Sequence, residues 1–285
     1  MSRIVYLNGQ YIAEEDAKIS VFDRGFLFAD GVYEGLAIIE GKLVDFDAHI
    51  MRLHRSLDEM RIKEACSDAD ILTIFRALIE KNNIKEGFMY LQITRGIADR
   101  DFVYPDDATP STLFAFTQEK NLIDTPLART GAKIITLEDQ RWSRRDLKTI
   151  QLVSQSMAKM EAKRNGADDA WLVDGIWVNE GTASNAFIIT HSDIIVTRDL
   201  SNKILHGITR AAILAVAKTL NLKIEERPFT IEEAINAKEA FITGSSSLVC
   251  PVVEINGQPI GTGKPEEIVK TIRSRYIDLM KKHST

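Results

Sequence analysis

The chain has 285 residues, of which 45% are hydrophobic and 27% are charged, and it contains 16 glycines and 7 prolines. These proportions are ordinary for a globular protein and exclude collagen-like and intrinsically disordered chains. The 36 basic and 41 acidic residues give a net charge of −5 without a long basic tract, so nucleic acid is not an expected partner.

Two β-hairpins are predicted near the beginning of the chain, because short apolar runs flank the turns Asn8-Gly9 and Glu40-Gly41. The four predicted strands are 4–7, 11–12, 32–39 and 43–46. Asp47 follows the last of them and can cap a helix whose apolar residues recur on one face.

A second helix and two more strands are predicted before the middle of the chain. They cover residues 68–82, 88–94 and 112–117. The following segment, 119–128, has weak periodicity and contains a proline, so we expect it to link two domains. The predicted domains are therefore residues 1–118 and residues 129–285.

The second half alternates strands and helices with short turns. The predicted strands are 132–137, 170–173 and 186–189, and the predicted helices are 150–165, 209–220 and 265–282. Asp174-Gly175 and Asn256-Gly257 mark further hairpins. Mixed sheets with helices on their faces predict an α/β fold, or α+β by some schemes.

Neither a membrane span nor a metal site is expected. The longest stretch without a charged side chain, between Glu239 and Glu254, is shorter than the roughly 20 apolar residues that a span needs. The amino terminus lacks the apolar stretch of a secretory signal, so a cytoplasmic location is expected. Cys66 and Cys250 lie far apart, and the histidines form no HExxH motif.

Two polar turns in the second half could hold an anion. The segment from Leu205 to Arg210 leads into a helix that Thr209 can cap, and the unpaired amides of a helix start suit a phosphate. The turn from Thr243 to Ser247 ends a strand and offers hydroxyl groups and open amides. An ordinary capped helix and an ordinary turn have the same composition, so these residues alone leave both interpretations open.

One lysine and one glutamate have the surroundings of reactive groups. Lys148 lies beside apolar residues and close to Arg144 and Arg145, which favour a neutral, nucleophilic amine. Glu180 lies among apolar and small residues, where a buried carboxylate needs a cation such as a protonated pyridine nitrogen. A solvated lysine and a plain turn glutamate are the ordinary alternatives.

Five blocks of sequence become informative when they are taken together. They are FADGVYE at 28–34, HIMRL at 49–53, DLK at 146–148, NEGTASN at 179–185 and GITR at 207–210. Their combination, order and spacing resemble the fold-type IV pyridoxal-phosphate enzymes over nearly the whole chain. That family contains D-amino-acid transaminases, branched-chain aminotransferases, aminodeoxychorismate lyases and (R)-selective amine transaminases.

The resemblance implies a fold and a role for each site residue. It implies two α/β domains with pyridoxal 5′-phosphate in the cleft between them. Lys148 would bind the cofactor as a Schiff base and move the proton at the substrate α-carbon. Glu180 would pair with the pyridine nitrogen, and Leu205 would pack against the ring. The phosphate would be held by Arg52, Ile208, Thr209 and Ser245.

Three segments, DRG at 23–25, GVYE at 31–34 and TRG at 94–96, look most like those of D-amino-acid transaminases. In those enzymes a tyrosine and an Arg-x-His triplet bind the substrate carboxylate. Here the expected substrate-binding residues are Tyr33, Arg100 and Phe102, and Phe102 replaces the histidine. From the residues alone, Tyr33 could also be a core residue and Arg100 an exposed loop cation. Arg141 lies near Lys148 and could also approach the site, but it is not included among the predicted site residues.

The resemblance implies a transaminase that moves an amino group from a D-amino acid to a 2-oxo acid with ping-pong kinetics. Because Phe102 replaces a polar residue, an (R)-selective amine transaminase is an alternative. A branched-chain L-amino-acid aminotransferase and an aminodeoxychorismate lyase remain alternatives within the fold. A non-catalytic ligand-binding protein is the alternative outside it, and Lys148 and Glu180 argue against that. A homodimer is also implied.

Overall fold

The computed structural model describes residues 2–285 and divides them into two compact units, each with its own sheet. The first unit contains the chain up to Asn121 together with Leu147–Gln151 and His283–Thr285, and the second contains Leu122–Asp146 and Leu152–Lys282. Lys148 therefore belongs to the first unit, whereas Glu180 belongs to the second. Within residues 2–285, no helix has the length and apolar character to cross a membrane.

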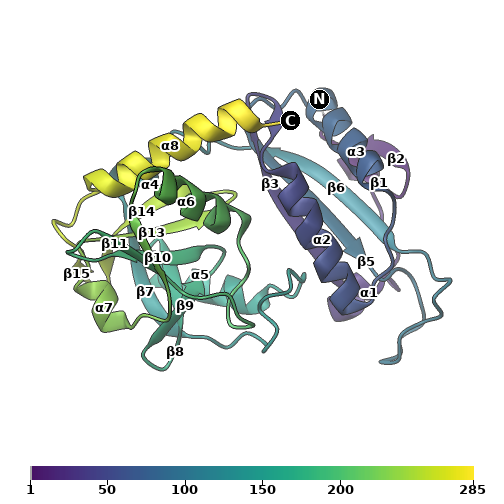
Figure 1. Cartoon of the computed structure of the whole chain (residues 1–285). Coiled ribbons are helices and arrows are strands. Elements are labelled where there is room, and N and C mark those ends of the chain that lie inside the picture. The colour runs from purple at the N-terminus through teal and green to yellow at the C-terminus, as the bar shows by residue number, and fades with distance from the viewer. Residues whose placement is uncertain (1) are drawn as a thin grey trace. The chain divides into compact units, whose positions relative to one another are not determined.

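The first unit is a six-stranded antiparallel sheet in the order β2-β1-β6-β5-β3-β4, with helices α2 and α3 on one face (Figure 1). Its strands are β1 (Ile4–Leu7), β2 (Gln10–Ala13), β3 (Gly31–Ile39), β4 (Lys42–Leu43), β5 (Gly87–Thr94) and β6 (Thr112–Glu119). Its helices are the 3₁₀ helix η1 (Glu14–Asp16), α1 (Arg24–Phe28), α2 (Phe46–Met60) and α3 (Asp68–Lys81).

The pleat of this sheet sorts side chains onto two faces. Glu34 lies opposite Leu91 in the register of β3 and β5, and Leu91 packs in the helix-covered core, so Glu34 points toward the helices. Tyr33, one residue earlier, lies opposite Gln92 and points to the other face. The sheet therefore separates the two side chains although they are adjacent in sequence.

Both predicted hairpins and the helix over 68–82 are confirmed in this unit, but the strand predicted over 43–46 is only Lys42–Leu43, and the predicted cap of α2 is wrong. Glu40 and Gly41 have the positive φ angles, 53° and 76°, that a tight hairpin turn requires. Helix α2 begins at Phe46 after Asp45, which is itself left-handed at φ 54°, so Asp47 lies inside the first turn. Its charge there still complements the helix dipole.

The second unit has a nine-stranded mixed sheet. Its main path is β12-β11-β10-β13-β14-β7-β8-β9, and β15 pairs with β14. Its strands are β7 (Ala132–Glu138), β8 (Asp169–Asp174), β9 (Trp177–Gly181), β10 (Asn185–Ile189), β11 (Ile194–Thr197), β12 (Lys223–Glu226), β13 (Glu239–Gly244), β14 (Leu248–Ile255) and β15 (Gln258–Pro259). Its helices are α4 (Pro126–Thr130), α5 (Val153–Arg164), α6 (Ile208–Thr219), α7 (Ile231–Ile235) and α8 (Glu267–His283).

This sheet must curl, because β9 and β10 are far apart along the path but adjacent in sequence. A flat sheet with strands about 4.8 Å apart would separate these two strands by about 24 Å. The residues between them, 182–184, span at most about 14 Å even when fully extended. The amide of Gly181 donates to the carbonyl of Ser184 at 2.7 Å, so the two strand ends do meet. The curl gathers polar residues from both strands in one place.

Two predicted features of the second unit are wrong in detail. The helix predicted over 150–165 begins only at Val153, because the preceding residues pair with β3 of the first unit's sheet; the Ile150 amide donates to Gly31 at 3.1 Å. Thr209 was expected to cap the next helix, but α6 begins at Ile208 after Gly207, without a side-chain cap. Thr209 lies in its first turn.

Candidate active site

Backbone pairing holds Lys148 beside Tyr33 within the first unit. The Tyr33 amide donates to the Lys148 carbonyl at 2.9 Å, and the Lys148 amide is 3.5 Å from the Ser56 hydroxyl. The Lys148 ammonium group, Nζ, lies 4.2 Å from the centre of the Tyr33 ring, within the distance of a cation–π contact. The structure thus brings two of the predicted site residues together.

The Tyr33 ring belongs to an aromatic wall on the open face of the sheet. It stacks on Tyr90 with ring centres 5.5 Å apart, and Tyr90 lies 5.0 Å from the ring of Phe116. The Tyr90 hydroxyl donates to Gln92 at 2.8 Å, and burial raises the pKa of Tyr90. Tyr90 therefore stays a neutral phenol, and the amine of Lys148 lies over the Tyr33 ring at the end of this aromatic wall.

Arg100 and Phe102 lie in the loop after β5. The Arg100 guanidinium is 5.4 Å from the ring centres of both Phe28 and Phe102, and those two rings are 5.7 Å apart. Phe102 is 78% exposed. Among residues 2–285, the ring contacts of this pair are with Phe28 and with each other, not with Tyr33. Their role in binding substrate stays a prediction.

Arg52 is anchored in a buried ionic cluster on the helix-covered face. Its Nε and Nη2 donate to the two oxygens of Glu34 at 2.7 Å each, and His49 Nδ1 is 2.6 Å from Glu34 Oε2. Burial alone would raise the pKa of Glu34, but Arg52 and His49 hold this pKa well below its usual range. A contact between Arg52 and a phosphate stays a prediction.

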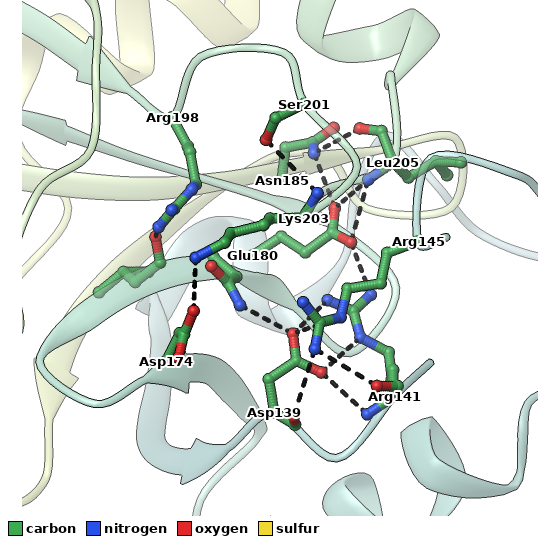
Figure 2. A network of polar contacts seen from close by, with 12 residues as sticks. Asp139, Arg141, Arg145, Asp174, Glu180, Asn185, Arg198, Ser201, Lys203 and Leu205 are labelled. Carbon is green, nitrogen blue, oxygen red and sulfur yellow. Dashed lines mark hydrogen bonds and ion pairs between the residues drawn. The ribbon is translucent and has the colours of Figure 1, made fainter. Parts of the chain in front are cut away.

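In the second unit, Glu180 lies at the centre of a buried polar network (Figure 2). Arg141 Nη1 donates to Glu180 Oε1 at 2.6 Å, and the fork of Arg141 binds both oxygens of Asp139 at 2.9 and 2.8 Å. The Leu205 amide lies 3.1 and 3.0 Å from the two Glu180 oxygens, and Asn185 Nδ2 donates to Oε2 at 2.9 Å. The carboxylate is thus fixed in both position and direction.

Burial and ion pairing act against each other at Glu180. The side chain is only 3% exposed, and its burial raises the pKa of the carboxyl group. The Arg141 charge and the Leu205 amide lower this pKa but do not fully compensate. A second cation near Glu180 would therefore favour its ionised form.

The same network positions the start of helix α6. Asn185 Nδ2 also donates to the carbonyl of Leu205 at 3.0 Å. A Cβ atom on Gly207 would lie 2.0 Å from Asn185 Oδ1, so a larger residue there would displace the Asn185 side chain from its contacts with Glu180 and Leu205. The first-turn amides of Ile208 and Thr209 have no partner within the helix and lie at the positive end of its dipole. This arrangement can bind an anion.

Two further turns meet beside β10 and contribute hydroxyl groups. Thr243 lies opposite Asn185 in the sheet, and a Cβ on Gly244 would be 3.1 Å from the carbonyl of Ala183. In the described part of the chain, the hydroxyls of Thr243 and Ser184 are buried without a hydrogen-bond partner. Unsatisfied buried hydroxyls are costly, and a ligand oxygen would satisfy them. Ser245, predicted to bind phosphate, lies half-buried in the turn that follows Thr243.

Sequence reasoning missed several residues of these networks. Asp139 and Arg141 were not predicted, and their only signal is an acidic and a basic residue two apart after a strand, which is common on surfaces. Glu34 and Asn185 lie inside the motifs but were not assigned roles. Asn185 could have been found, because it ends the block that contains Glu180 and begins a buried strand.

Comparison with known proteins gives consistent matches over most of the chain. The family described as "Amino-transferase class IV" matches residues 31–255. "D-alanine aminotransferase" of Staphylococcus aureus (strain N315) is 33% identical over 282 residues, which cover 98% of this chain and 99% of the relative. The "D-alanine aminotransferase" of Bacillus licheniformis is 35% identical and covers 95% of this chain and 94% of its own.

A solved structure shows the same fold. The branched-chain amino acid aminotransferase from Escherichia coli superposes with a TM-score of 0.88 at 21% identity. The match covers 98% of this chain and 95% of that protein. The predicted mixed α/β fold class is therefore confirmed.

Proposed function

Because the chain belongs to the class IV aminotransferases, we propose that it transfers the amino group of a D-amino acid, such as D-alanine or D-glutamate, to a 2-oxo acid. Family membership confirms the resemblance inferred from the motifs, and with it pyridoxal 5′-phosphate as the cofactor. The observation that carries the choice of D-amino acids is the 33% and 35% identity to D-alanine aminotransferases over nearly the whole chain.

The residues of the second unit fit this cofactor. The open amides of Ile208 and Thr209 and the unpartnered hydroxyl of Thr243 suit a phosphate, and Ser245 would add a further donor. Glu180 is a fixed, buried carboxylate that suits a protonated ring nitrogen. When bound, pyridoxal phosphate supplies an electron-withdrawing ring that weakens the α C–H bond of an amino acid.

We assign the proton transfer to Lys148. Its neutral amine would remove the proton from the substrate α-carbon, and its protonated form would return one. The Tyr33 ring, 4.2 Å from Nζ, restricts where the amine can move. Tyr33 and Arg100 would bind the substrate carboxylate, and Phe102 would add an apolar surface for the substrate side chain.

The test is single-turnover loss of the cofactor absorbance band with D-alanine, L-leucine and (R)-1-phenylethylamine offered separately. We expect D-alanine to react fastest with the wild type, and Lys148→Ala to show no turnover. Faster reaction with L-leucine or with the amine would replace the proposal by one of the alternative activities. Wild-type activity in Lys148→Ala would refute the role of the lysine.

Steady-state kinetics give an independent test of the amino-transfer scheme. The keto acid made from the first substrate leaves before the second substrate binds, so double-reciprocal plots should be parallel. Intersecting lines would contradict a ping-pong mechanism.

We also propose that the enzyme is a homodimer. Large apolar side chains on the first unit are exposed in the single chain, including Phe22, Phe26, Phe102 and Val103, and aromatic residues are typical of subunit interfaces. Sedimentation velocity should give about twice the mass of 32.0 kDa. A monomer at micromolar concentration would contradict this. A cytoplasmic location also stays a prediction, which cell fractionation would test.

A further inference from the structure

We propose that Arg141, anchored by Asp139, is the positioning residue that keeps Glu180 ionised and aimed at a cationic aromatic nitrogen. The inference rests on the proposed function, because that function supplies the nitrogen. Sequence reasoning left Arg141 outside the site, and its place emerges only from the contacts shown in Figure 2.

The buried side chain of Arg141 is held between two carboxylates, those of Asp139 and Glu180. Its side chain is 7% exposed, and four contacts join it to the two carboxylates. Three of them come from the fork and backbone amide of Arg141 to Asp139, at 2.8 to 3.1 Å. The remaining Nη1 is then directed at Glu180 Oε1, at 2.6 Å. Because the guanidinium is planar and rigid, binding to Asp139 also fixes the direction in which Nη1 donates to Glu180.

Asp139 is itself fixed by independent contacts. Asn179 Nδ2 donates to its Oδ2 at 2.9 Å, and Arg145 Nε lies 3.2 Å from the same oxygen. The Asp139 amide donates to the carbonyl of Val173 at 2.8 Å, which joins it to β8. The anchor therefore belongs to the framework of the curled sheet and does not depend on a ligand.

The charges explain why Glu180 needs this partner. The charged groups that face Glu180 are Arg141 in direct contact and Asp139 behind it. Burial raises the pKa of Glu180, and Arg141 is the main influence that lowers it. Without Arg141, Glu180 would be protonated closer to neutral pH, and a protonated carboxyl group cannot stabilise a ring cation.

The first test uses the protein without cofactor, so that it does not depend on catalysis. The Glu180 carboxyl carbon is followed by NMR against pH in ¹³C-glutamate-labelled protein and is assigned with Glu180→Gln. In Arg141→Met and Arg141→Gln, its pKa should rise by about 1 to 3 units, the range for removing an adjacent opposite charge. Arg141→Lys should bring it back part of the way.

Arg144→Met is the matched control. It removes the same charge from the same segment, but from an arginine that pairs with Asp146. Its Glu180 titration should be that of the wild type. The Arg141→Gln variant keeps polar contacts to Asp139 available, so it can replace Arg141→Met if the latter does not fold. An unchanged Glu180 titration in any folded variant without a cation at position 141 overturns the inference.

The second test uses the protein loaded with pyridoxal phosphate ¹⁵N-labelled at the ring nitrogen. In the wild type, the ¹⁵N shift should report a protonated nitrogen to higher pH than in Arg141→Met. The cofactor dissociation constant, measured at equilibrium, should rise in Arg141→Met and not in Arg144→Met. Failure of the wild type to bind pyridoxal phosphate would refute the proposed function. Equal ¹⁵N titrations in an active wild type and in Arg141→Met would refute only the role of Arg141.

Discussion

Each unit buries a glutamate against an arginine, and the pKa values of these two glutamates, Glu34 and Glu180, are shifted in opposite directions. Glu34 in the first unit is 1% exposed and Glu180 in the second is 3% exposed, so burial raises the pKa of both. The pKa of Glu34 nevertheless ends well below its ordinary value, whereas that of Glu180 ends above it.

The difference lies in how each arginine is shared. Arg52 gives two hydrogen bonds to Glu34, which also contacts His49. Arg141 gives one hydrogen bond to Glu180 and binds Asp139 with the rest of its fork. The Glu34 carboxylate is charge-balanced within the chain, whereas the Glu180 carboxylate can be stabilised further by an added cation. The pairing of Glu34 therefore supports the fold, and the network around Glu180 is suited to a cationic ligand.

The largest effect on stability is expected for Glu34→Gln. This change leaves the buried Arg52 without its counter-charge, and breaking such a pair costs about 3–5 kcal/mol in the free energy of unfolding. Urea unfolding at neutral pH measures it. Glu14→Gln is the control, because Glu14 pairs with Arg3 at 2.5 Å with both side chains well exposed, and such pairs contribute about 1 kcal/mol or less. Equal effects of the two changes would mean that the Glu34 cluster is not structural.

Glu180→Gln should act mainly on catalysis. We expect kcat to fall at least about 100-fold, the scale for removing one preorganised electrostatic contact. In the protein without cofactor, the same change should affect stability in a pH-dependent way. Because the folded-state pKa of Glu180 is raised, the wild type becomes less stable as pH rises through that pKa, whereas glutamine does not titrate. The free energy of unfolding of the variant should therefore increase relative to that of the wild type as pH increases.

Glu226→Gln is the control for this second change. Glu226 pairs with Arg210 at 2.7 Å in the same unit, but its own side chain is 47% exposed. Its kcat should equal that of the wild type. A wild-type kcat in Glu180→Gln would contradict the comparison, because Glu180 would then be structural like Glu34.

Turns and helices could be predicted from the sequence, but contacts between residues far apart in the chain could not. The turns at Asn8-Gly9 and Glu40-Gly41 and the helix α3 follow from short-range rules, and the structure has them. The predicted cap of α6 is wrong, because the helix begins at Ile208, directly after Gly207, which lies so close to Asn185 that a Cβ atom would be 2.0 Å from its Oδ1. That contact arises only when the sheet curls, and no local pattern reports it.

The buried networks were harder to predict for a related reason. Arg141 and Asp139 are only two residues apart, but their importance depends on Glu180, which is 39 residues away from Arg141. Glu34 lies in a recognisable motif beside Tyr33. Only the strand register shows that the two side chains point to opposite faces, Glu34 into the ionic cluster and Tyr33 into the aromatic wall. The chemical character of each residue could be predicted from the sequence, whereas the residue with which it pairs could not.

The smallest expected effect concerns His49, the third member of the Glu34 cluster. Burial lowers the pKa of His49, although Glu34 opposes this. The unfolded chain then binds a proton below about pH 6.5 that the folded chain resists, so stability should fall as pH decreases from that value. The slope is at most about 1.4 kcal/mol per pH unit. His49→Gln should remove this slope below about pH 6.5, as unfolding at stepped pH would show. His54→Gln, on the same helix but paired with Asp68 near the surface, should retain it.

An unchanged slope in His49→Gln would mean that His49 stays protonated beside Glu34. The Glu34 cluster would then carry an extra positive charge, which would contradict the comparison with Glu180.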